Sequence, residues 1–469
     1  MTISLHWFRR DLRLHDNPAL AAAVTSSSGS FGVVCAHELT ALNPRQRAFV
    51  TAAVRSLSAT LLKQDASISI VDGDAPSGLA AIAVRLGATR VYCERALDPG
   101  ESMLERAAEA ALNAAGVELV RVGATTIHEP EAVAELKRAA GHGYRVFPPY
   151  YDAWKRLPVQ RAGETHAPSG LDPLRGALPD ADAVSNAPVA TEAAGMETLA
   201  RFVSARAADY GANAEYPGRN ATSQLGPYLR FGLVSARSVY RAVREKMVRS
   251  WTLAQERDSM EAFVRRLAWR DFYMHLAHFV PAVIDQPLQE KMFGFAPGES
   301  SAHADAWEAG MTGYPLVDAA MRQLHAEGRV HQRAAVVAAS FATADLGMDW
   351  RIGRDVWMRE LLVADAALCA GNWQRIAGLG SDQAAYPRIY NPIRQAYQID
   401  AQATYIRRYC KELAKLPTRA ALEPWKIAKE VQAELGFFTP EQYPEPIVDH
   451  ATAARDFLAR YQAYRNHAS

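Results

Sequence analysis

The first 130 residues alternate short hydrophobic, β-rich runs with longer stretches of helical periodicity, such as 45–62 and 101–115. Strands that recur about every 30 residues with helices between them favour a parallel sheet with right-handed crossovers. We therefore predict an α/β, Rossmann-like domain over 1–130, with any ligand at the carboxyl ends of the strands. The predicted strands are Ile3–Trp7, Phe31–Ala36, Ser67–Val71, Thr89–Tyr92 and Val117–Val120.

The amino-acid composition changes after this domain. Residues 157–195 are rich in Pro, Ala, Gly and Asp and carry few large hydrophobic residues, which is typical of a surface connection. We predict an interdomain linker over 131–199.

From residue 200 onward strand signals nearly vanish and helical periodicity dominates. Segments 316–325 and 334–346 read as buried helices. We therefore predict an all-α domain over 200–469. One helix face of this domain is marked by Phe263, Leu267, Phe272, Leu276 and Phe279.

Composition agrees with a globular protein of two to three domains. The chain has 469 residues, of which 49% are hydrophobic and 22% are charged, so a wholly disordered chain is excluded. The formal net charge is only +1, so any surface for nucleic acid must be local.

Cysteine usage and the amino-terminal sequence bear on the compartment. Cys35, Cys93, Cys369 and Cys410 lie far apart with no CxxC, as is usual in a reducing environment. The opening MTISLHWFRRDLRLHD carries three arginines and two aspartates, which is unlike a signal peptide. No uninterrupted apolar stretch reaches the roughly 18 residues of a membrane span. We expect a soluble cytoplasmic protein without a membrane partner.

The segment Asn220–Tyr228 has hydroxyls at Thr222 and Ser223, just before a predicted helix. These groups suit either an ordinary helix N-cap or a phosphate site. From Arg219 to Asp271 there are eleven Lys or Arg and five Asp or Glu, a local excess of 11 − 5 = +6. This excess fits either a solvated helix face or a polyanionic partner.

Two further segments carry candidate chemistry. Trp269 beside Arg270 suits either a core aromatic with a paired neighbour or a site that stacks a base and binds a phosphate. His275 and His278 have no further ligand at metal spacing, so we predict no metal site. Between 312 and 392, Trp350, Trp373 and Asp365 lie among small residues, which indicates a cofactor pocket in a helical domain.

These segments together resemble one known family, the DNA photolyases and cryptochromes, and above all the microbial cyclobutane pyrimidine dimer photolyases. The similarity covers about residues 1–150 and 200–425. It implies an antenna-type domain followed by an all-helical FAD-binding domain. The motifs that carry it, in order, are LHWFRRDLRLHDNPAL, TSQLGPYLRFG, AWRDFY, TGYPLVDAAMRQL, the pair Asp349-Trp350, GNWQ and YPRIYNP.

The resemblance assigns roles to individual residues. It implies FAD contacts by Tyr210, Thr222, Ser223, Gln224, Leu225, Gly226, Arg270, Asp365 and Cys369. It implies that Trp373 and Trp350 are the inner tryptophans of the chain that photoreduces the flavin, and that Trp269 and Arg333 contact the lesion. It also allows a second, antenna chromophore, a folate or a deazaflavin, although the folate-binding residues are poorly matched around Pro99-Gly-Glu101.

The sequence also departs from the family pattern. Cys369 replaces the asparagine beside the reactive flavin nitrogen, as in insect cryptochromes, and a thiol is a weak hydrogen-bond donor. Ala335 and Val363 replace an Arg–Asp pair, so both charges are lost together. The outermost photoreduction tryptophan, expected near Pro297, is missing. In the lesion pocket Arg266 replaces a glutamate, Arg375 a tryptophan, Val336 a methionine and Gln332 an asparagine.

Two functions follow from the resemblance. The first is light-driven repair of cyclobutane pyrimidine dimers by electron transfer from reduced FAD, with UV-damaged DNA as partner and a monomeric protein. The second is a cryptochrome-like photoreceptor or redox flavoprotein that has lost repair, which the altered flavin and lesion pockets favour. A third function, that of a nucleotide-binding protein without photochemistry, is the least favoured.

Overall fold

The protein is described by a computed structural model, which covers residues 2–137, 143–160, 163–164, 166–170, 176–180, 187–249, 251–298, 303–381 and 386–467. The chain divides into two compact units. The first comprises Met1–Tyr210 and Ser223–Pro281, and the second comprises Gly211–Thr222 and Ala282–Ser469.

The first unit contains a five-stranded parallel sheet of order β3-β2-β1-β4-β5. Leu5 in the central strand pairs with Phe31 on one side and Val91 on the other. The predicted α/β fold and all five predicted strands are confirmed, with shifts of a few residues at their ends. The strands are β1 (Ile3–Trp7), β2 (Gly29–Cys35), β3 (Ile68–Val71), β4 (Ala88–Arg95) and β5 (Glu118–Ala124).

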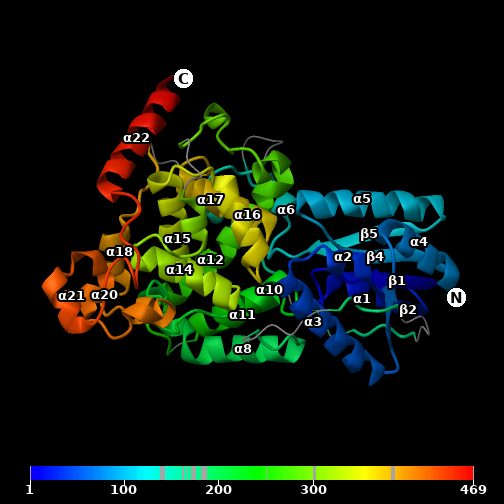
Figure 1. The fold of residues 1–469 in the computed structure, drawn as a ribbon. Coiled ribbons are helices and arrows are strands. Elements are labelled where there is room, and N and C mark those ends of the chain that lie inside the picture. Colours follow the sequence, from blue (N-terminus) through cyan, green and yellow to red (C-terminus); the bar gives the residue numbers. More distant parts are fainter. Residues whose placement is uncertain are drawn as a thin grey trace. The chain divides into compact units, whose positions relative to one another are not determined.

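Helices cover both faces of this sheet (Figure 1). Leu5 and Trp7 point into a core shared with α4 (Ala75–Leu86) and α5 (Pro99–Ala114). On the other face, Ser4 Oγ donates to Ala23 O of α1 (Pro18–Thr25) at 2.7 Å. The alternation of side chains along a strand explains why one strand serves both layers. Helices α2 (Ala36–Thr40) and α3 (Pro44–Leu62) follow β2.

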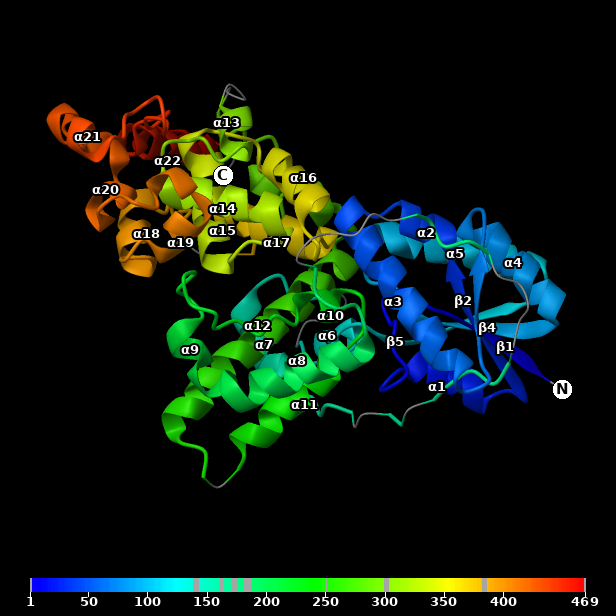
Figure 2. The ribbon, with the colours of Figure 1, turned by 60° about the horizontal axis from the view of Figure 1, so that its bottom comes forward.

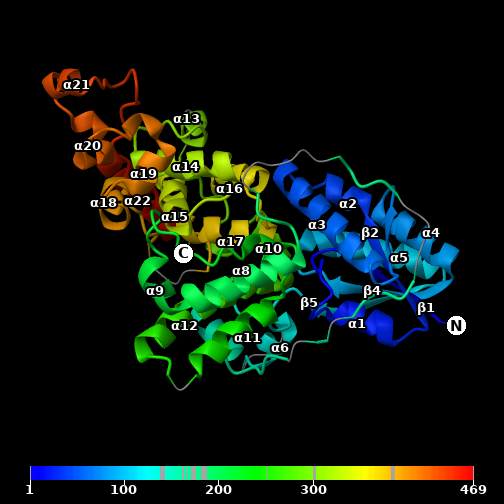
Figure 3. The same ribbon diagram turned by 90° about the horizontal axis from the view of Figure 1, so that it is seen from below.

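The helices of the first unit that follow the sheet pack on one another. Helix α12 (Ala254–Phe279) contacts α7 (Phe147–Trp154) and α11 (Ala236–Met247), and α11 contacts α8 (Glu192–Ala205). Figures 2 and 3 show α8, α11 and α12 side by side. The same layer holds α6 (Pro130–Glu135), η1 (Ala207–Asp209) and α10 (Gly226–Arg230), while α9 (Tyr210–Asn213) lies where the two units divide.

These helices are joined to the sheet domain by buried polar contacts. Arg13 Nη1 donates to Gly232 O at 2.9 Å, and the backbone N–H groups of Leu14 and His15 donate to Glu192. Gly232 has φ +67°, and a Cβ there would lie 1.7 Å from Arg10 O. Only glycine fits this close approach of two backbones.

The predicted domain boundaries at 130 and 199 remain predictions. Helices α6 and α7 and the start of α8 lie inside the stretch predicted as linker, whereas the described residues between 157 and 190 form no helix or strand. The segment at the centre of the predicted linker is therefore irregular wherever the structure describes it.

The second unit is helical among its described residues. Its core surrounds the fully buried Trp307 and Trp373. The predicted buried helix 334–346 is confirmed as far as Asp345, with α15 running to Ser340 and a π-helical segment continuing it over Phe341–Asp345. The helices are α13 (Ala304–Glu308), α14 (Pro315–Glu327), α15 (Gln332–Ser340), α16 (Trp350–Glu360), α17 (Ala366–Ala377), α18 (Pro392–Ile399), α19 (Thr404–Tyr409), α20 (Thr418–Leu422), α21 (Lys429–Leu435) and α22 (His450–His467).

Within the part of the chain that the structure describes, every helix is too short or too polar to cross a bilayer.

Candidate flavin and DNA site

Helix α17 places three of the predicted flavin-site residues on one face. Asp365 is the N-cap of the helix, with its carboxylate accepting from Leu368 N at 3.1 Å, and it is 1% exposed. Cys369 and Trp373 follow at steps of four residues, and both are buried. Since residues four apart lie above one another on a helix, the structure brings this carboxylate, thiol and indole into one row.

The Trp373 ring is held by aromatic neighbours that sequence reasoning missed. Its centroid lies 4.8 Å from that of Trp357 and 6.0 Å from that of Trp307, both in T-shaped geometry. A Cβ at Gly353 would lie 2.1 Å from the same ring, so the indole rests directly on the backbone of α16. The seven-residue spacing of Trp350 and Trp357 is the signal that would have placed both on one face of that helix.

Trp350, the other predicted photoreduction residue, lies next to two arginine side chains. The guanidinium carbons of Arg351 and Arg354 lie 5.0 and 5.2 Å from its ring centroid. The indole N–H groups of Trp350, Trp357 and Trp373 are buried without a hydrogen-bond acceptor among the described residues. Trp350 therefore packs against cations, whereas Trp373 packs against aromatic rings.

The lesion-pocket residues of the second unit lie on two helices, α15 and α17. Gln332 is the exposed first residue of that helix. Arg333 donates from Nη2 to Gln395 Oε1 at 2.9 Å, and its guanidinium carbon lies 5.3 Å from the Tyr390 ring centroid. Arg375 lies in the last turn of α17. Ala335 is buried, and Val336 packs against the same hydrophobic core.

In the first unit, the adjacent residues Trp269 and Arg270 of α12 have different surroundings. Trp269 stacks on Phe147 with ring centroids 3.7 Å apart and planes within 8°. Arg270 donates to Thr125 O at 3.0 Å and Thr125 Oγ1 at 2.7 Å, next to the end of β5. Arg266 is exposed one turn before them. The flavin contact of Arg270 stays a prediction, because these contacts show it joining α12 to the end of the sheet.

Arg270 also pairs with the buried Asp271 at 3.2 Å. That carboxylate accepts from Ile127 N at 2.8 Å and from Trp154 Nε1 at 3.1 Å. Burial raises its pKa to about 6, against the opposing effect of the Arg270 charge. The desolvation cost therefore exceeds the gain from the ion pair.

The two histidines of α12 contact different residues. His275 Nε2 accepts from Tyr144 N at 2.8 Å, and burial lowers the pKa of this ring to about 3, so it is neutral. His278 pairs with Glu131 at 2.7 Å.

The segment Thr222–Gly226 has the backbone of an anion site. Gln224 adopts the left-handed region with φ 59°, and Leu225 returns to the right-handed region with φ −82°. Successive N–H groups in such an alternation form a concavity that binds anions. Ser223 adds a hydroxyl, which here accepts from Leu225 N at 3.3 Å. The donors fit the diphosphate of FAD, so the residues implied by the resemblance suit that cofactor.

Tyr210 precedes this segment in the chain and begins α9. Its ring packs edge-on against Phe263 at 5.3 Å and against Phe202 at 5.9 Å between centroids. Aromatic packing therefore anchors it within the first unit.

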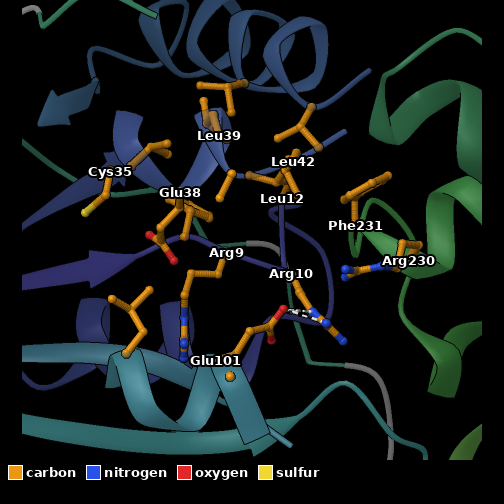
Figure 4. A pocket seen from close by; sticks show the side chains of 17 residues that line it. Arg9, Arg10, Leu12, Cys35, Glu38, Leu39, Leu42, Glu101, Arg230 and Phe231 are labelled. Atoms are coloured by element: carbon orange, nitrogen blue, oxygen red, sulfur yellow. Dashed lines mark hydrogen bonds and ion pairs between the residues drawn. The ribbon is translucent and has the colours of Figure 1, made fainter. Parts of the chain in front are cut away.

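A cavity of about 240 Å³ lies at the carboxyl ends of β1 and β2, beside the start of α5 (Figure 4). Arg9 lies in its wall with a side chain 9% exposed; its Nη2 pairs with Glu105 at 2.6 Å, whereas its Nε and Nη1 have no hydrogen-bond partner among the described residues. Glu38 accepts from Trp7 Nε1 at 2.8 Å, and burial raises its pKa to about 7. Arg10 pairs with Glu101 at the same cavity. Ligand sites of open parallel sheets occur at this edge.

Comparison with known proteins places these features in one family. The family model of the FAD-binding domain of DNA photolyase matches residues 263–463, and the DNA photolyase model matches residues 4–169. A deoxyribodipyrimidine photo-lyase of Agrobacterium fabrum is 32% identical over 483 residues, covering 98% of this chain and 97% of that protein.

Solved structures agree with the sequence comparison. A class III photolyase from Agrobacterium tumefaciens superposes with a TM-score of 0.86 at 28% identity, covering 99% of this chain and 98% of that one. A cryptochrome from Synechocystis has a TM-score of 0.86 at 26% identity, covering 98% and 99%. This chain is thus a member of the DNA photolyase and cryptochrome family, and its residues 263–463 match the FAD-binding domain of DNA photolyase.

Proposed function

We propose that this protein repairs cyclobutane pyrimidine dimers in UV-damaged DNA with the energy of blue light. The observation that carries the proposal is the likeness to a deoxyribodipyrimidine photo-lyase over 98% of the chain. The stacked indole of Trp269 and the side chain of Arg333 support it, because a base and a phosphate are bound by such groups.

Bound and reduced FAD would supply, on excitation, the electron that splits the dimer and that the products return. The role of the chain's own residues is to bind and orient this cofactor. The hydroxyls and backbone N–H groups of Thr222–Gly226 would hold the diphosphate, together with Tyr210. Asp365 would accept a hydrogen bond from the cofactor, and Cys369 lies one turn further along α17.

DNA binding falls to the basic residues of the candidate site. Trp269 stacks on a base of the flipped dimer, and Arg333 binds a phosphate of the DNA. Arg266, Arg375 and Gln332 replace groups that contact bases in the family pattern. Two of the three replacements are cationic, so they exchange base contacts for contacts to phosphate.

A light-dependent repair assay tests the proposal. Purified protein should be coloured and should release FAD on denaturation. With reduced cofactor and blue light it should restore dimer-bearing thymine oligonucleotides, and in the dark it should not. A colourless, flavin-free preparation, or equal product in light and dark, would contradict the proposal.

A second function is favoured by one specific set of substitutions. Cys369 replaces an asparagine beside the flavin, and Ala335 and Val363 replace an ion pair. A flavin photoreceptor or redox protein of cryptochrome type that no longer repairs DNA would retain FAD and photoreduction while leaving dimers intact. The same assay separates the two functions.

The cavity at the sheet edge suits the second, antenna chromophore, a planar molecule with an anionic group facing Arg9. Leu42 lines this cavity, so Leu42→Trp should fill it. We expect the variant to lose any second chromophore while FAD remains, as measured by absorption of the released pigments. Loss of FAD in this variant, or full retention of a second pigment, would place that chromophore elsewhere.

We also propose that the protein is a monomer, which sedimentation tests.

A further inference from the structure

We infer that Phe147 is a positioning residue of the lesion site: it fixes the ring plane of Trp269 and thereby sets the preference for dimer-bearing over undamaged DNA. The inference rests on the proposed function, because the role of Trp269 toward the lesion belongs to it. Phe147 itself lies on α7, outside every motif that points to DNA.

The contact between the two rings is unusually close and parallel. Their centroids are 3.7 Å apart and the planes differ by 8°, while Phe147 is only 1% exposed. A ring that is buried on α7 and lies flat on the indole prevents that indole from tilting. Phe272 and Tyr273 of α12 lie 5.6 and 5.4 Å from the same indole between ring centroids, so Phe147 is the ring that lies flat against it.

Helix α7 continues the stack beneath Phe147. Phe147 and Tyr151 are stacked with centroids 5.5 Å apart and planes within 13°, and Tyr151 and Trp154 follow at 6.0 Å and 27°. The three rings recur at steps of four and three residues, so they share one face of the helix. Trp269 and these three rings therefore form a four-ring stack.

Both helices hold this stack in place by hydrogen bonds. The Tyr151 hydroxyl donates to Glu261 of α12, and Trp154 Nε1 donates to the buried Asp271 of the same helix at 3.1 Å. Because these bonds join α7 to α12 on either side of Trp269 in the sequence, the Phe147 ring has no freedom to retreat from it.

Removing the Phe147 ring should therefore act on specificity more than on general DNA binding. In Phe147→Leu the indole gains freedom to tilt, and part of the stacking with the flipped base is lost, which we expect to weaken binding of dimer-bearing DNA about five- to tenfold. Affinity for undamaged duplex comes from phosphate contacts and should change less than about twofold.

The test compares dissociation constants for two duplexes that differ only in the dimer, in the dark and at one salt concentration. Phe147→Leu should lower the affinity ratio about five- to tenfold, and Phe147→Tyr, which keeps the stacked ring, should restore it. The matched control is Phe49→Leu. Phe49 of α3 is 2% exposed and packs on Tyr228 and Phe231 rather than on the rings of the stack, so the same substitution there should leave the ratio unchanged.

A second readout needs no DNA. Coupled aromatic rings give near-ultraviolet circular dichroism, and Phe147→Leu should change the same bands as Trp269→Phe. An unchanged affinity ratio in Phe147→Leu, or an equal drop in Phe49→Leu, would overturn the inference alone. A wild-type protein that does not prefer the dimer-bearing duplex would instead overturn the proposed function, and the inference with it.

Discussion

Replacing Gly353 by leucine should lower the free energy of unfolding by about 3 kcal/mol or more. A Cβ at this position would lie 2.1, 2.5 and 2.6 Å from three carbons of the Trp373 ring. That ring is 0% exposed and is enclosed by Trp357 and Trp307, so it cannot yield without moving its neighbours. Overpacking of a dense core forces strained rotamers and backbone shifts.

The effect should extend to the cofactor, because Trp373 shares a helix face with Cys369 and Asp365. We expect Gly353→Leu to lose FAD during purification, with denaturant titration measuring the loss of stability. Ile352→Ala is the matched control on the same helix, since Ile352 is 41% exposed, and it should stay within about 1 kcal/mol of the wild type. Wild-type stability and flavin content in Gly353→Leu would show that the core yields at this point.

The second large effect is expected at Asp271. Asp271→Ala should lower the free energy of unfolding by about 3–5 kcal/mol, because it leaves the Arg270 guanidinium without its carboxylate. The N–H groups of Ile127 and Trp154 also lose their acceptor. Asp271→Asn keeps one acceptor oxygen and the side-chain volume, so it should lower the free energy of unfolding by less than Asp271→Ala does. Equal stability of the alanine and asparagine variants would contradict this account.

The same residue predicts a pH dependence. The pKa of Asp271 rises from 3.8 to about 6 in the folded state, so between these values the folded protein binds more protons than the unfolded chain. Stability from this group is therefore highest below pH 3.8 and falls as the pH rises to 6. The free energy of unfolding of the wild type, relative to that of Asp271→Asn, should accordingly fall as the pH rises across this interval and level off above it. Denaturant titration at a series of pH values measures this difference.

The sequence allowed prediction of those features that depend on local pattern. All five strands were placed correctly, because β-rich hydrophobic runs between helical stretches identify a parallel sheet without knowledge of distant contacts. The face that joins Asp365, Cys369 and Trp373 could also be predicted, since a four-residue step on one helix fixes it.

Features that arise from contacts between distant segments were not predictable in this way. The stack of Phe147 on Trp269 joins residues 122 positions apart, and nothing in either local sequence indicates it. The attachment of Arg270 to Thr125 has the same origin. The change from α- to π-helix at Phe341–Asp345 was not predictable either, because its hydrophobic residues keep a helical spacing while the hydrogen bonds change.

The joints between sheet and helices in the first unit limit how the protein can be dissected. A fragment ending at residue 130 would leave Ile127 N, Thr125 O and Leu14 N facing water where they now meet Asp271, Arg270 and Glu192. Gly232, packed against Arg10 O, would be missing as well. Expression of the amino-terminal portion alone should consequently give a poorly folded, protease-sensitive product, and useful truncations have to retain everything through α12.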